Sequence, residues 1–406
     1  KPEPPGQMIY TELDVPLQQA ILDPEKPALA LLKQAAAKID TKLLGYVPPE
    51  VMQKRRRIAL GVVVGGFAMV LGAALFMLRR LSMSVAGEPG SRPAGVRSWR
   101  YHLVPWLFMA PAVLSIAVWA YYPLARGLVM AFQDYRITQP PTFIGLDNFI
   151  EAATQETFWR GIRNSFEYVG LTLAIGFGLP ILLALMLSEV PRGKMLFRTL
   201  YYLPAVTSSL VVLFLWKQFY DPSPQGLLNQ VVAGMNAAVN WLAGTLHLGI
   251  ALPTEVNIDW LGDPSLAMLA VIIPGVWAGA GPGSIIYLAA LKTIPDEMYE
   301  AADLDGAGVW AKIRMVTLPA LKPLIIINLV GAFIGAFKAM ENIFVMTGGG
   351  PVYRTHTIGL EVWYNAFMYL KFGYATAAAW IMGAMLIGFT LYQLRILRDL
   401  RFSAGG

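Results

Sequence analysis

The amino-acid sequence predicts an all-α membrane protein, a polytopic bundle of helices that cross the lipid bilayer. Hydrophobic residues make up 56% of the 406 residues and charged residues only 14%, whereas soluble domains carry about 25% charged residues. The mean hydropathy is +0.52. Several apolar runs also reach the roughly 20 residues that a helix needs to cross the hydrocarbon core.

Seven apolar segments are long enough to span the membrane. In chain order they cover residues 58–78, 103–125, 166–188, 200–220, 265–291, 318–340 and 374–394. We treat the last six as one unit, a six-span core over residues 100–406. Polar connections flank each of these six segments, and their Lys and Arg residues can be counted on either side of the membrane.

The distribution of Lys and Arg orients this six-span core. If residue 100 lies inside, the inner connections hold fourteen of these cations and the outer ones hold seven. The inner cations are Arg79, Arg80, Arg92, Arg97, Arg100, Arg192, Lys194, Arg198, Lys292, Lys312, Arg314, Arg395, Arg398 and Arg401. The outer cations are Arg126, Arg136, Arg160, Arg163, Lys217, Arg354 and Lys371. Because positively charged connections stay in the cytoplasm, both ends of the core, including the C-terminus, are predicted to be cytoplasmic.

The N-terminal part of the chain lies outside this core. Residues 1–57 form a polar, proline-rich extension, and residues 58–99 predict an extra transmembrane helix with its linker. Lys54–Arg57 and Arg79–Arg80 flank this helix with positive charge on both sides, so charge does not orient it. Counting spans back from a cytoplasmic segment at 79–102 places the extension outside.

The outer connection at residues 221–263 has a structure of its own. It contains an amphipathic run near residues 226–248, followed by Pro, Asn, Asp and Trp residues. We interpret it as a helix that lies at the membrane surface, followed by a loop.

Composition excludes several kinds of site. The chain has no cysteine, which rules out disulfides, thiolate metal ligands and thiol catalysis. The net charge of +6 comes from cations beside apolar runs, a pattern of membrane orientation and not of nucleic-acid binding. His102, His247 and His356 lie far apart in the sequence, so we interpret them as ordinary interfacial residues and predict no metal site.

A charged segment, residues 293–317, interrupts the apolar pattern on the side predicted to be cytoplasmic. Thr can cap a helix, Pro is tolerated in a first turn and acids favour the positive helix end, so residues 293–296 predict a helix start. The helix is expected to run to Asp305. Gly306 and Gly308 then supply the left-handed or hinge conformation that a helix stop needs.

A second short helix is expected over residues 309–317. In the first helix, Ala301 and Ala302 permit close approach to another surface, and the flanking apolar groups can fill a groove. Unstructured loops of this length are uncommon. We therefore interpret the segment as a docking element and not as a plain connector.

The same segment carries the signature of a known family. Glu300-Ala301-Ala302, Gly306, Ile313, Leu318 and Pro319 resemble the EAA signature of ABC-importer permeases. Thr347–Pro351, followed by Thr355, looks like the TGGGP segment of the maltose-type sugar permeases. Phe372–Ala377 resembles the start of their final helix, and Leu203-Pro204-Ala205 fits their third core span. The resemblance covers about residues 100–400.

This resemblance implies a type I importer core with a coupling helix at residues 294–317, which sits in a cleft of a cytoplasmic ATPase. The candidate ATPase-coupling residues are Glu300, Ala301, Ala302, Gly306, Leu318 and Pro319. Glu300 is the acid expected to touch the ATPase, and Asp303 is the alternative. The implied partners are a second homologous permease, two ABC ATPase subunits and an extracytoplasmic solute-binding protein, at the bacterial cytoplasmic (inner) membrane.

The chain itself is not predicted to hydrolyse ATP. It has no G-x-x-x-x-G-K-[ST] run, and the glycine clusters at 279–283 and 348–350 lack the Lys-Ser or Lys-Thr that a phosphate-binding loop needs. No paired carboxylates stand at catalytic spacing. We therefore predict that this chain is not an enzyme and holds no cofactor, and that ATP and Mg are bound by the partner ATPase subunits.

Polar residues inside spans are costly and tend to face a cavity or a partner helix. The glycines and prolines of the span at 265–291 predict a broken helix, which transporters use near binding sites. Sugars are bound by aromatic faces and hydrogen-bonding side chains. The candidate substrate-path residues are Trp277, Tyr287, Asn328, Phe333 and Glu341. Helix packing is the alternative interpretation of each, and Lys338 is spaced to pair with Glu341.

We therefore predict one permease subunit of an ATP-driven ABC importer for a carbohydrate, an oligosaccharide such as maltose or trehalose. Within the family, glycerol-phosphate or another polar solute is the alternative, and Lys338 is the only candidate cation for an anion site. An ion-coupled secondary transporter is a more distant alternative. It predicts acids in the middle of spans, whereas Glu341 lies near a span end.

Overall fold

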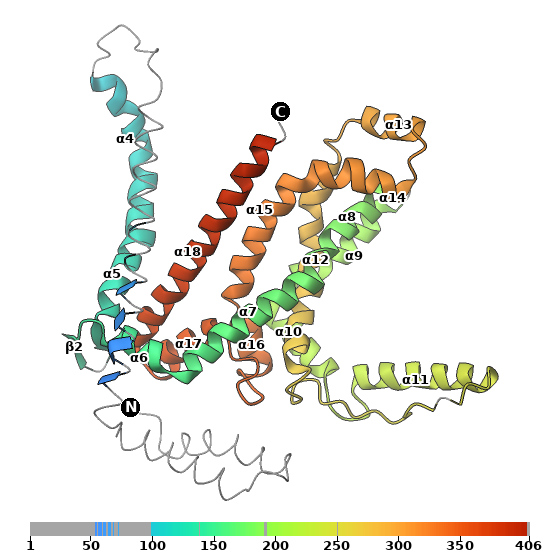
Figure 1. Cartoon of the computed structure of the whole chain (residues 1–406), viewed down its shortest axis with the longest axis horizontal. Coiled ribbons are helices and arrows are strands. Elements are labelled where there is room, and N and C mark those ends of the chain that lie inside the picture. Colours follow the sequence, from blue (N-terminus) through green and yellow to red (C-terminus); the bar gives the residue numbers. More distant parts are fainter. Residues whose placement is uncertain are drawn as a thin grey trace, which may run out of the picture. The chain divides into compact units, whose positions relative to one another are not determined.

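The computed structural model describes residues 99–403, apart from 138, 191, 192 and 250, together with scattered residues between 53 and 72 (Figure 1). The predicted extension at 1–57 and the extra helix with its linker at 58–99 therefore lie almost entirely outside the described residues. The chain divides into a first unit, residues 1–158 with 362–389, and a second unit, residues 159–361 with 390–406.

In the first unit, one long helix contains the first predicted core span. It consists of α4 (Trp99–Ile116), the π-helical turn η1 (Ala117–Tyr121) and α5 (Tyr122–Ala131). Pro123 lies in the first turn of α5, where a residue without an N–H is tolerated. Trp119 exposes 81% of its surface, as expected of a helix that faces lipid.

A β-hairpin follows α5 and is the only strand pairing among the described residues. Strands β1 (Gln133–Arg136) and β2 (Gln139–Phe143) are antiparallel, with Gln133 opposite Phe143. Pro140 and Pro141 cannot donate to a ladder, which confines them to an edge strand such as β2. The unit also contains α6 (Asp147–Thr154), the π-helical turn η3 (Tyr364–Met368) and the first part of α18 (Phe372–Ser403).

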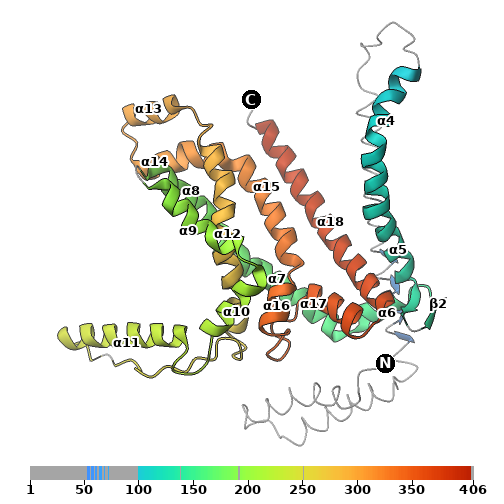
Figure 2. The same ribbon diagram turned by 180° about the vertical axis from the view of Figure 1, so that it is seen from behind.

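The described part of the second unit is helical. Its elements are α7 (Glu156–Gly176), α8 (Leu179–Glu189), α9 (Lys194–Val206), α10 (Ser209–Phe219), α11 (Leu227–Thr245), α12 (Ala267–Leu291), α13 (Asp296–Leu304), α14 (Val309–Lys312), η2 (Ile313–Thr317), α15 (Leu318–Phe337), α16 (Glu341–Met346) and α17 (Ile358–Trp363). Its core joins α8, α12 and α15 through Ala184, Leu187, Tyr287, Leu288 and Leu321. Figures 1 and 2 show α13 at one end of this unit and α11 at the other.

Five helices in the described part of the chain are long and apolar enough to cross a membrane, and a bent pair brings the number to six. The five cover residues 106–131, 156–189, 267–291, 309–346 and 372–393. The bent pair joins residues 195–206 to residues 209–219. Each overlaps one of the six predicted core spans, which confirms an all-α polytopic fold.

The predicted position of the broken span is wrong. α12 is one continuous helix despite Pro274 and Pro282 inside it, whereas the preceding span is bent by 95° between α9 and α10. The glycines of α12 serve close packing, since a Cβ at Gly281 would lie 2.0 Å from the carbonyl oxygen of Tyr201. A glycine can either let two helix backbones approach closely or let a helix bend. In α12 the glycines do the first.

The predicted separate helix at residues 309–317 is also wrong. α14 and η2 run directly into α15, so residues 309–337 form one continuous helix that contains a π-helical turn. Pro319 lies in the first turn of α15, where the widened turn before it accommodates a residue without an N–H. The charged segment is therefore continuous with a membrane span.

Candidate functional site

The candidate coupling segment is built around α13, whose start is set by local sequence. Pro295 takes the N-cap position with an extended backbone, and Asp296 and Glu297 follow in the first turn, where acids interact favourably with the helix dipole. Thr293 does not cap α13 as predicted, because its hydroxyl donates to the carbonyl oxygen of Ala290 at 2.7 Å. The helix therefore begins directly after the proline.

The end of α13 confirms the conformation predicted for Gly306. Its φ is +74°, in the left-handed region that glycine adopts without steric cost. The Gly306 N–H donates to the Asp303 carbonyl oxygen at 3.0 Å, and the Ala307 N–H donates to the Ala302 carbonyl oxygen at 2.9 Å. These two bonds form a Schellman motif. Gly308 differs from the prediction, because its backbone is extended and it takes the N-cap position of α14.

Two side-chain contacts fix α13 to the helix that leads into the membrane. The Tyr299 hydroxyl lies 3.1 Å from the hydroxyl oxygen of Thr317, in the π-helical turn before α15. Asp303 forms an ion pair with Lys312 in α14. Because α14, η2 and α15 are continuous, these two contacts join α13 to the helix that contains the span.

The surface of this segment combines acids with exposed apolar side chains. No residue of α13 is buried, and Glu300 and Ala301 are exposed whereas Ala302 is half-buried. The apolar side chains that are at least 75% exposed are Leu304, Val309, Trp310 and Met315. Such a patch is typical of a contact with another macromolecule.

The six candidate coupling residues thus fall into two groups. Glu300, Ala301 and Ala302 lie on α13 with Gly306 at its end, whereas Leu318 and Pro319 lie in the first turn of α15. The contact between Tyr299 and Thr317, the residue before Leu318, joins the two groups.

The five candidate substrate-path residues lie in different surroundings within the second unit. Tyr287 is buried in the core, where its hydroxyl lies next to the Asn328 side chain, and neither the hydroxyl nor the amide nitrogen bonds another described group. Trp277 is 45% exposed, and its ring meets the Trp216 ring edge-on at 5.9 Å between centroids.

The two remaining candidates lie on the segment from α15 to α16. Phe333 is buried and stacks on Phe337, with ring centroids 5.9 Å apart. Glu341 is exposed and accepts a hydrogen bond from the Ser209 hydroxyl at 2.6 Å, in place of the pairing with Lys338 that the spacing suggests. Ser209 begins α10 directly after the bend, so this carboxylate lies at a helix N-terminus, where negative charge is favoured.

Sequence reasoning missed the contacts that hold the loop containing the Thr347–Pro351 motif. The Asn164 amide in α7 donates to the Tyr353 carbonyl oxygen at 2.7 Å. Arg354 donates two bonds to the Glu167 carboxylate, at 2.7 and 2.6 Å. Asn164 and Glu167 share one face of α7 at a spacing of three residues, but no local signal links them to a loop so much later in the chain.

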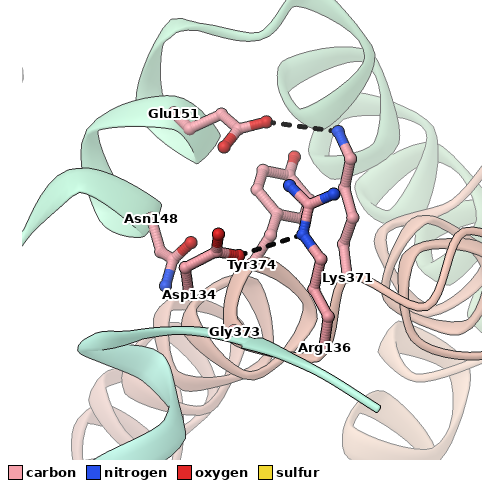
Figure 3. A pocket seen from close by; sticks show the side chains of 7 residues that line it. All are labelled: Asp134, Arg136, Asn148, Glu151, Lys371, Gly373 and Tyr374. Carbon is pink, nitrogen blue, oxygen red and sulfur yellow. Dashed lines mark hydrogen bonds and ion pairs between the residues drawn. The ribbon is translucent and has the colours of Figure 1, made fainter. Parts of the chain in front are cut away.

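A polar pocket of about 160 Å³ lies between β1, α6 and the start of α18 in the first unit (Figure 3). Two ion pairs line it, Asp134 with Arg136 at 3.1 Å and Glu151 with Lys371 at 3.6 Å. A Cβ at Gly373 would lie 2.1 Å from a carbonyl oxygen of β1. The glycine of the predicted motif at the start of the final helix therefore permits close contact with the hairpin.

Comparison with known proteins places this arrangement in a family. Residues 176–401 match the family of binding-protein-dependent transport system inner membrane components. The chain belongs to this family. The permease is 32% identical over 287 residues to the probable ABC transporter permease protein YesP of Bacillus subtilis, covering 69% of this chain and 86% of YesP.

Two further relatives are informative. The permease is 29% identical over 303 residues to the lactose transport system permease protein LacF of Rhizobium radiobacter, covering 74% of this chain and 95% of LacF. Its fold is similar to that of a bacterial alginate ABC transporter, solved in complex with an alginate pentasaccharide-bound periplasmic protein. That similarity has a TM-score of 0.61 and 27% identity, and it covers 74% of this chain and 96% of the other.

These findings confirm the predicted family. The chain is a sugar-type ABC transporter permease with several membrane-spanning helices, and its family is a component of an inner membrane. The family is a transport family and not an enzyme class. Within the described residues, no cluster of three or more His, Asp or Glu side chains is placed to hold a metal ion.

Proposed function

We propose that this permease forms half of the pore of an ATP-driven importer for a carbohydrate, an oligosaccharide such as maltose or trehalose. An extracytoplasmic binding protein delivers the solute, and a second homologous permease completes the pore. Several relatives support this proposal. The family is named for its dependence on a binding protein, one relative is named for lactose transport, and the similar transporter was solved with an oligosaccharide-bound periplasmic protein.

The observation that carries the proposal is the attachment of α13 to α15. α13 presents acids and an apolar patch, while Tyr299 and Asp303 attach it to Thr317 and Lys312. Without such contacts, a docking helix could be displaced by the ATPase while the span stayed in place. The ATPase subunits, which bind ATP and Mg, dock on the cytoplasmic side, and one of them receives α13 in a cleft.

Glu300 is the acid that we assign to the ATPase contact. Asp303, the alternative, is engaged by Lys312, whereas Glu300 has no ion pair within the described part of the chain. A charged group on an apolar docking surface fixes orientation and suppresses wrong partners. Glu300 therefore fixes the position of α13 on the ATPase, and the apolar patch contributes the surface area that docking buries.

We infer a transport cycle in which this attachment carries the movement. Closure of the ATPases on ATP pushes the segment at 294–317, and Thr317 passes the displacement to α15, which turns the cavity outward. Release after hydrolysis returns the cavity inward. The excess of cations on this side supports a cytoplasmic position for α13 and the C-terminus.

We place the solute path beside the bent span between α9 and α10. Glu341 and Ser209 meet at this bend, and Trp277 has a partly exposed ring. The Asn328 amide nitrogen is buried without a hydrogen-bond partner among the described residues. An amide and an aromatic face suit a sugar hydroxyl and a sugar ring. Tyr287 and Phe333 are buried in this structure, so they reach solute only in another state of the cycle.

An anionic solute such as glycerol-phosphate is the second candidate. A second solved structure similar to this chain is that of a bacterial ABC transporter involved in the import of the acidic polysaccharide alginate, and Lys338 is exposed at the end of α15. Lys338→Gln separates the two, because it would abolish uptake of an anion and leave uptake of a neutral sugar unchanged.

The coupling assignment is tested in proteoliposomes that contain the permeases, the ATPase subunits and the binding protein. Glu300→Lys is expected to lower solute-stimulated ATP hydrolysis about thirtyfold or more, since breaking a buried interfacial charge pair costs about 2 kcal/mol or more. Asp305→Lys, an exposed acid after the last turn of α13, is the matched control and retains activity. Full activity in Glu300→Lys would contradict the assignment. If ATP hydrolysis were coupled normally but no sugar were taken up, only the proposed identity of the solute would be contradicted.

A further inference from the structure

The outward face of α11 is apolar, which is the reverse of a helix in water. Its large apolar side chains that expose at least 42% of their surface are spaced along one side of the helix: Leu227, Val231, Met235, Val239, Trp241 and Leu242. The sequence contains no Asp, Glu, Lys or Arg from residue 222 to residue 254. The partner of this face is therefore expected to be apolar and to bind without ion pairs.

The opposite face of α11 is occupied by the return segment, residues 251–258. The Asn236 amide donates to the Pro253 carbonyl oxygen at 2.8 Å. The Asn240 amide donates to the Leu252 carbonyl oxygen at 2.8 Å, and its side-chain oxygen accepts from the Leu252 N–H at 2.7 Å. These polar side chains of the helix are thus satisfied by its own return segment.

The base of this arm is fixed to the end of α10. Asn229 is fully buried, donates to the Ile258 carbonyl oxygen at 3.2 Å and accepts from the Trp260 indole N–H at 2.9 Å. The Trp260 ring meets that of Tyr220, directly after α10, at 6.0 Å between centroids. The arm is therefore held at a fixed height relative to the end of a membrane span.

The return segment and the apolar face lie on opposite sides of α11. α11 runs crosswise to α10 and α12 at the end of the unit opposite α13, and the return segment lies on the side of α11 turned away from α13 (Figures 1 and 2). α10, which precedes the arm, also exposes large apolar side chains: Leu210, Val211, Phe214 and Leu215. Because α10 belongs to a membrane span, these side chains are expected to contact lipid.

We propose that α11 is an interfacial helix, which inserts its face from Leu227 to Leu242 among the acyl chains of the leaflet opposite α13. The return segment lies in the headgroup layer above it. Trp241 is suited to the headgroup level, where tryptophan is enriched. A protein partner would call for a polar rim with hydrogen-bonding groups, whereas the asparagines of α11 are engaged by the return segment. The proposal depends on membrane location and not on the solute.

The proposal makes a specific statement about lipid chemistry. Interfacial helices commonly carry Lys and Arg on the polar face, which attract anionic lipids. α11 has no such residue, so its insertion depends on apolar contact alone. Adding anionic lipid should therefore leave the depth of insertion unchanged.

The absence of cysteine makes a direct test of depth feasible. The full chain, assembled in its transporter, is placed in nanodiscs of phosphatidylcholine with a spin label at Met235→Cys or, as a second site, Val231→Cys. Thr254→Cys, exposed in the return segment, is the matched control. Labels at 235 and 231 are expected to collide with oxygen and not with a water-soluble nickel chelate, and the label at 254 is expected to show the reverse. Added phosphatidylglycerol should change neither result.

Two outcomes would overturn the proposal. Nickel accessibility at 235 equal to that at 254 would place the face in water. Protection of 235 from both reagents would place it against a protein, either the binding protein or the second permease.

Discussion

α13 and α11 lie at opposite ends of the second unit, and both are exposed, but their surfaces differ in kind. α13 contains Asp296, Glu297, Glu300 and Asp303, whereas α11 contains no charged residue. α13 is attached through its side chains to a span, whereas α11 is attached through asparagines mainly to its own return segment. Exposure alone therefore does not identify a partner. Charge and the mode of attachment do.

The difference in attachment also suits the two helices to different roles: α13 to transmitting movement and α11 to anchoring. Tyr299 and Asp303 connect α13 to a helix that continues through the membrane, so a push on α13 must move the span. The bonds of Asn236 and Asn240 end on the return segment. Only the base of the arm, at Asn229 and Trp260, is fixed to the end of α10, so a push on the outer part of α11 would be absorbed within the arm.

A matched pair of glycine substitutions should give the largest contrast between the two regions. Neither Gly306 nor Gly234 has an atom within 4 Å of an added Cβ, but only Gly306 has a positive φ. Gly306→Trp is expected to abolish solute-stimulated ATP hydrolysis, because it obstructs the docking surface and because a left-handed residue other than glycine costs about 1–2 kcal/mol. Gly234→Trp in α11 should leave hydrolysis intact.

A conservative variant at Gly306 separates the effect of its backbone conformation from the effect of a large side chain. Gly306→Asn should retain most of the activity, because asparagine also adopts the left-handed conformation at a helix end. Equal loss in Gly306→Trp and Gly234→Trp would mean that the two regions do not differ in function.

Asn240→Ala should loosen the arm without affecting coupling. It removes two exposed bonds to Leu252, and a typical intramolecular hydrogen bond contributes about 0.5–1.5 kcal/mol. Hydrogen exchange of the return segment at 251–258 should accelerate, while solute-stimulated hydrolysis stays unchanged. A loss of hydrolysis in this variant would show that α11 transmits movement after all.

Tyr299→Phe should weaken transmission while leaving docking intact. The change removes one hydroxyl contact to Thr317, which is worth about 0.5–1.5 kcal/mol. We expect more ATP hydrolysed per solute imported, with the ATPase subunits still bound. Thr317→Val should reproduce the effect, and the double variant should be no worse than either single one. Additive losses would argue against a shared contact.

Asp303→Asn should have the smallest effect. Its ion pair with Lys312 is partly exposed, and such pairs contribute about 0.2–1 kcal/mol. Hydrolysis at moderate ionic strength should fall slightly, and salt should reduce the difference from the unchanged permease. A loss as large as that of Glu300→Lys would identify Asp303 as the acid that meets the ATPase.

The spans were predictable from sequence because a long apolar run has few alternatives in a membrane. The stop at Gly306 was predictable for a similar reason, since glycine is strongly favoured at a left-handed helix end. The bend was not predictable, because glycine and proline serve close packing in α12, whereas the break falls at Thr207 and Ser208 in the preceding span.

The side-chain contacts that attach α13 to the span were not predictable either. Tyr299 and Thr317 are 18 positions apart, and their meeting depends on how α13 folds back over the start of α15. The same holds for Arg354 and Glu167, which are 187 positions apart. Local patterns locate elements, but pairings across a fold depend on tertiary geometry.

The central claim, that α13 is the ATPase-docking helix, is tested most directly by site-specific crosslinking in the assembled transporter. A photoreactive group is attached at Ala301→Cys, with Thr254→Cys as the control in the same cysteine-free chain. We predict that the group at 301 crosslinks to the ATPase subunit and the group at 254 does not. Absence of a crosslink from 301 in a transporter that still hydrolyses ATP in response to solute would contradict the claim.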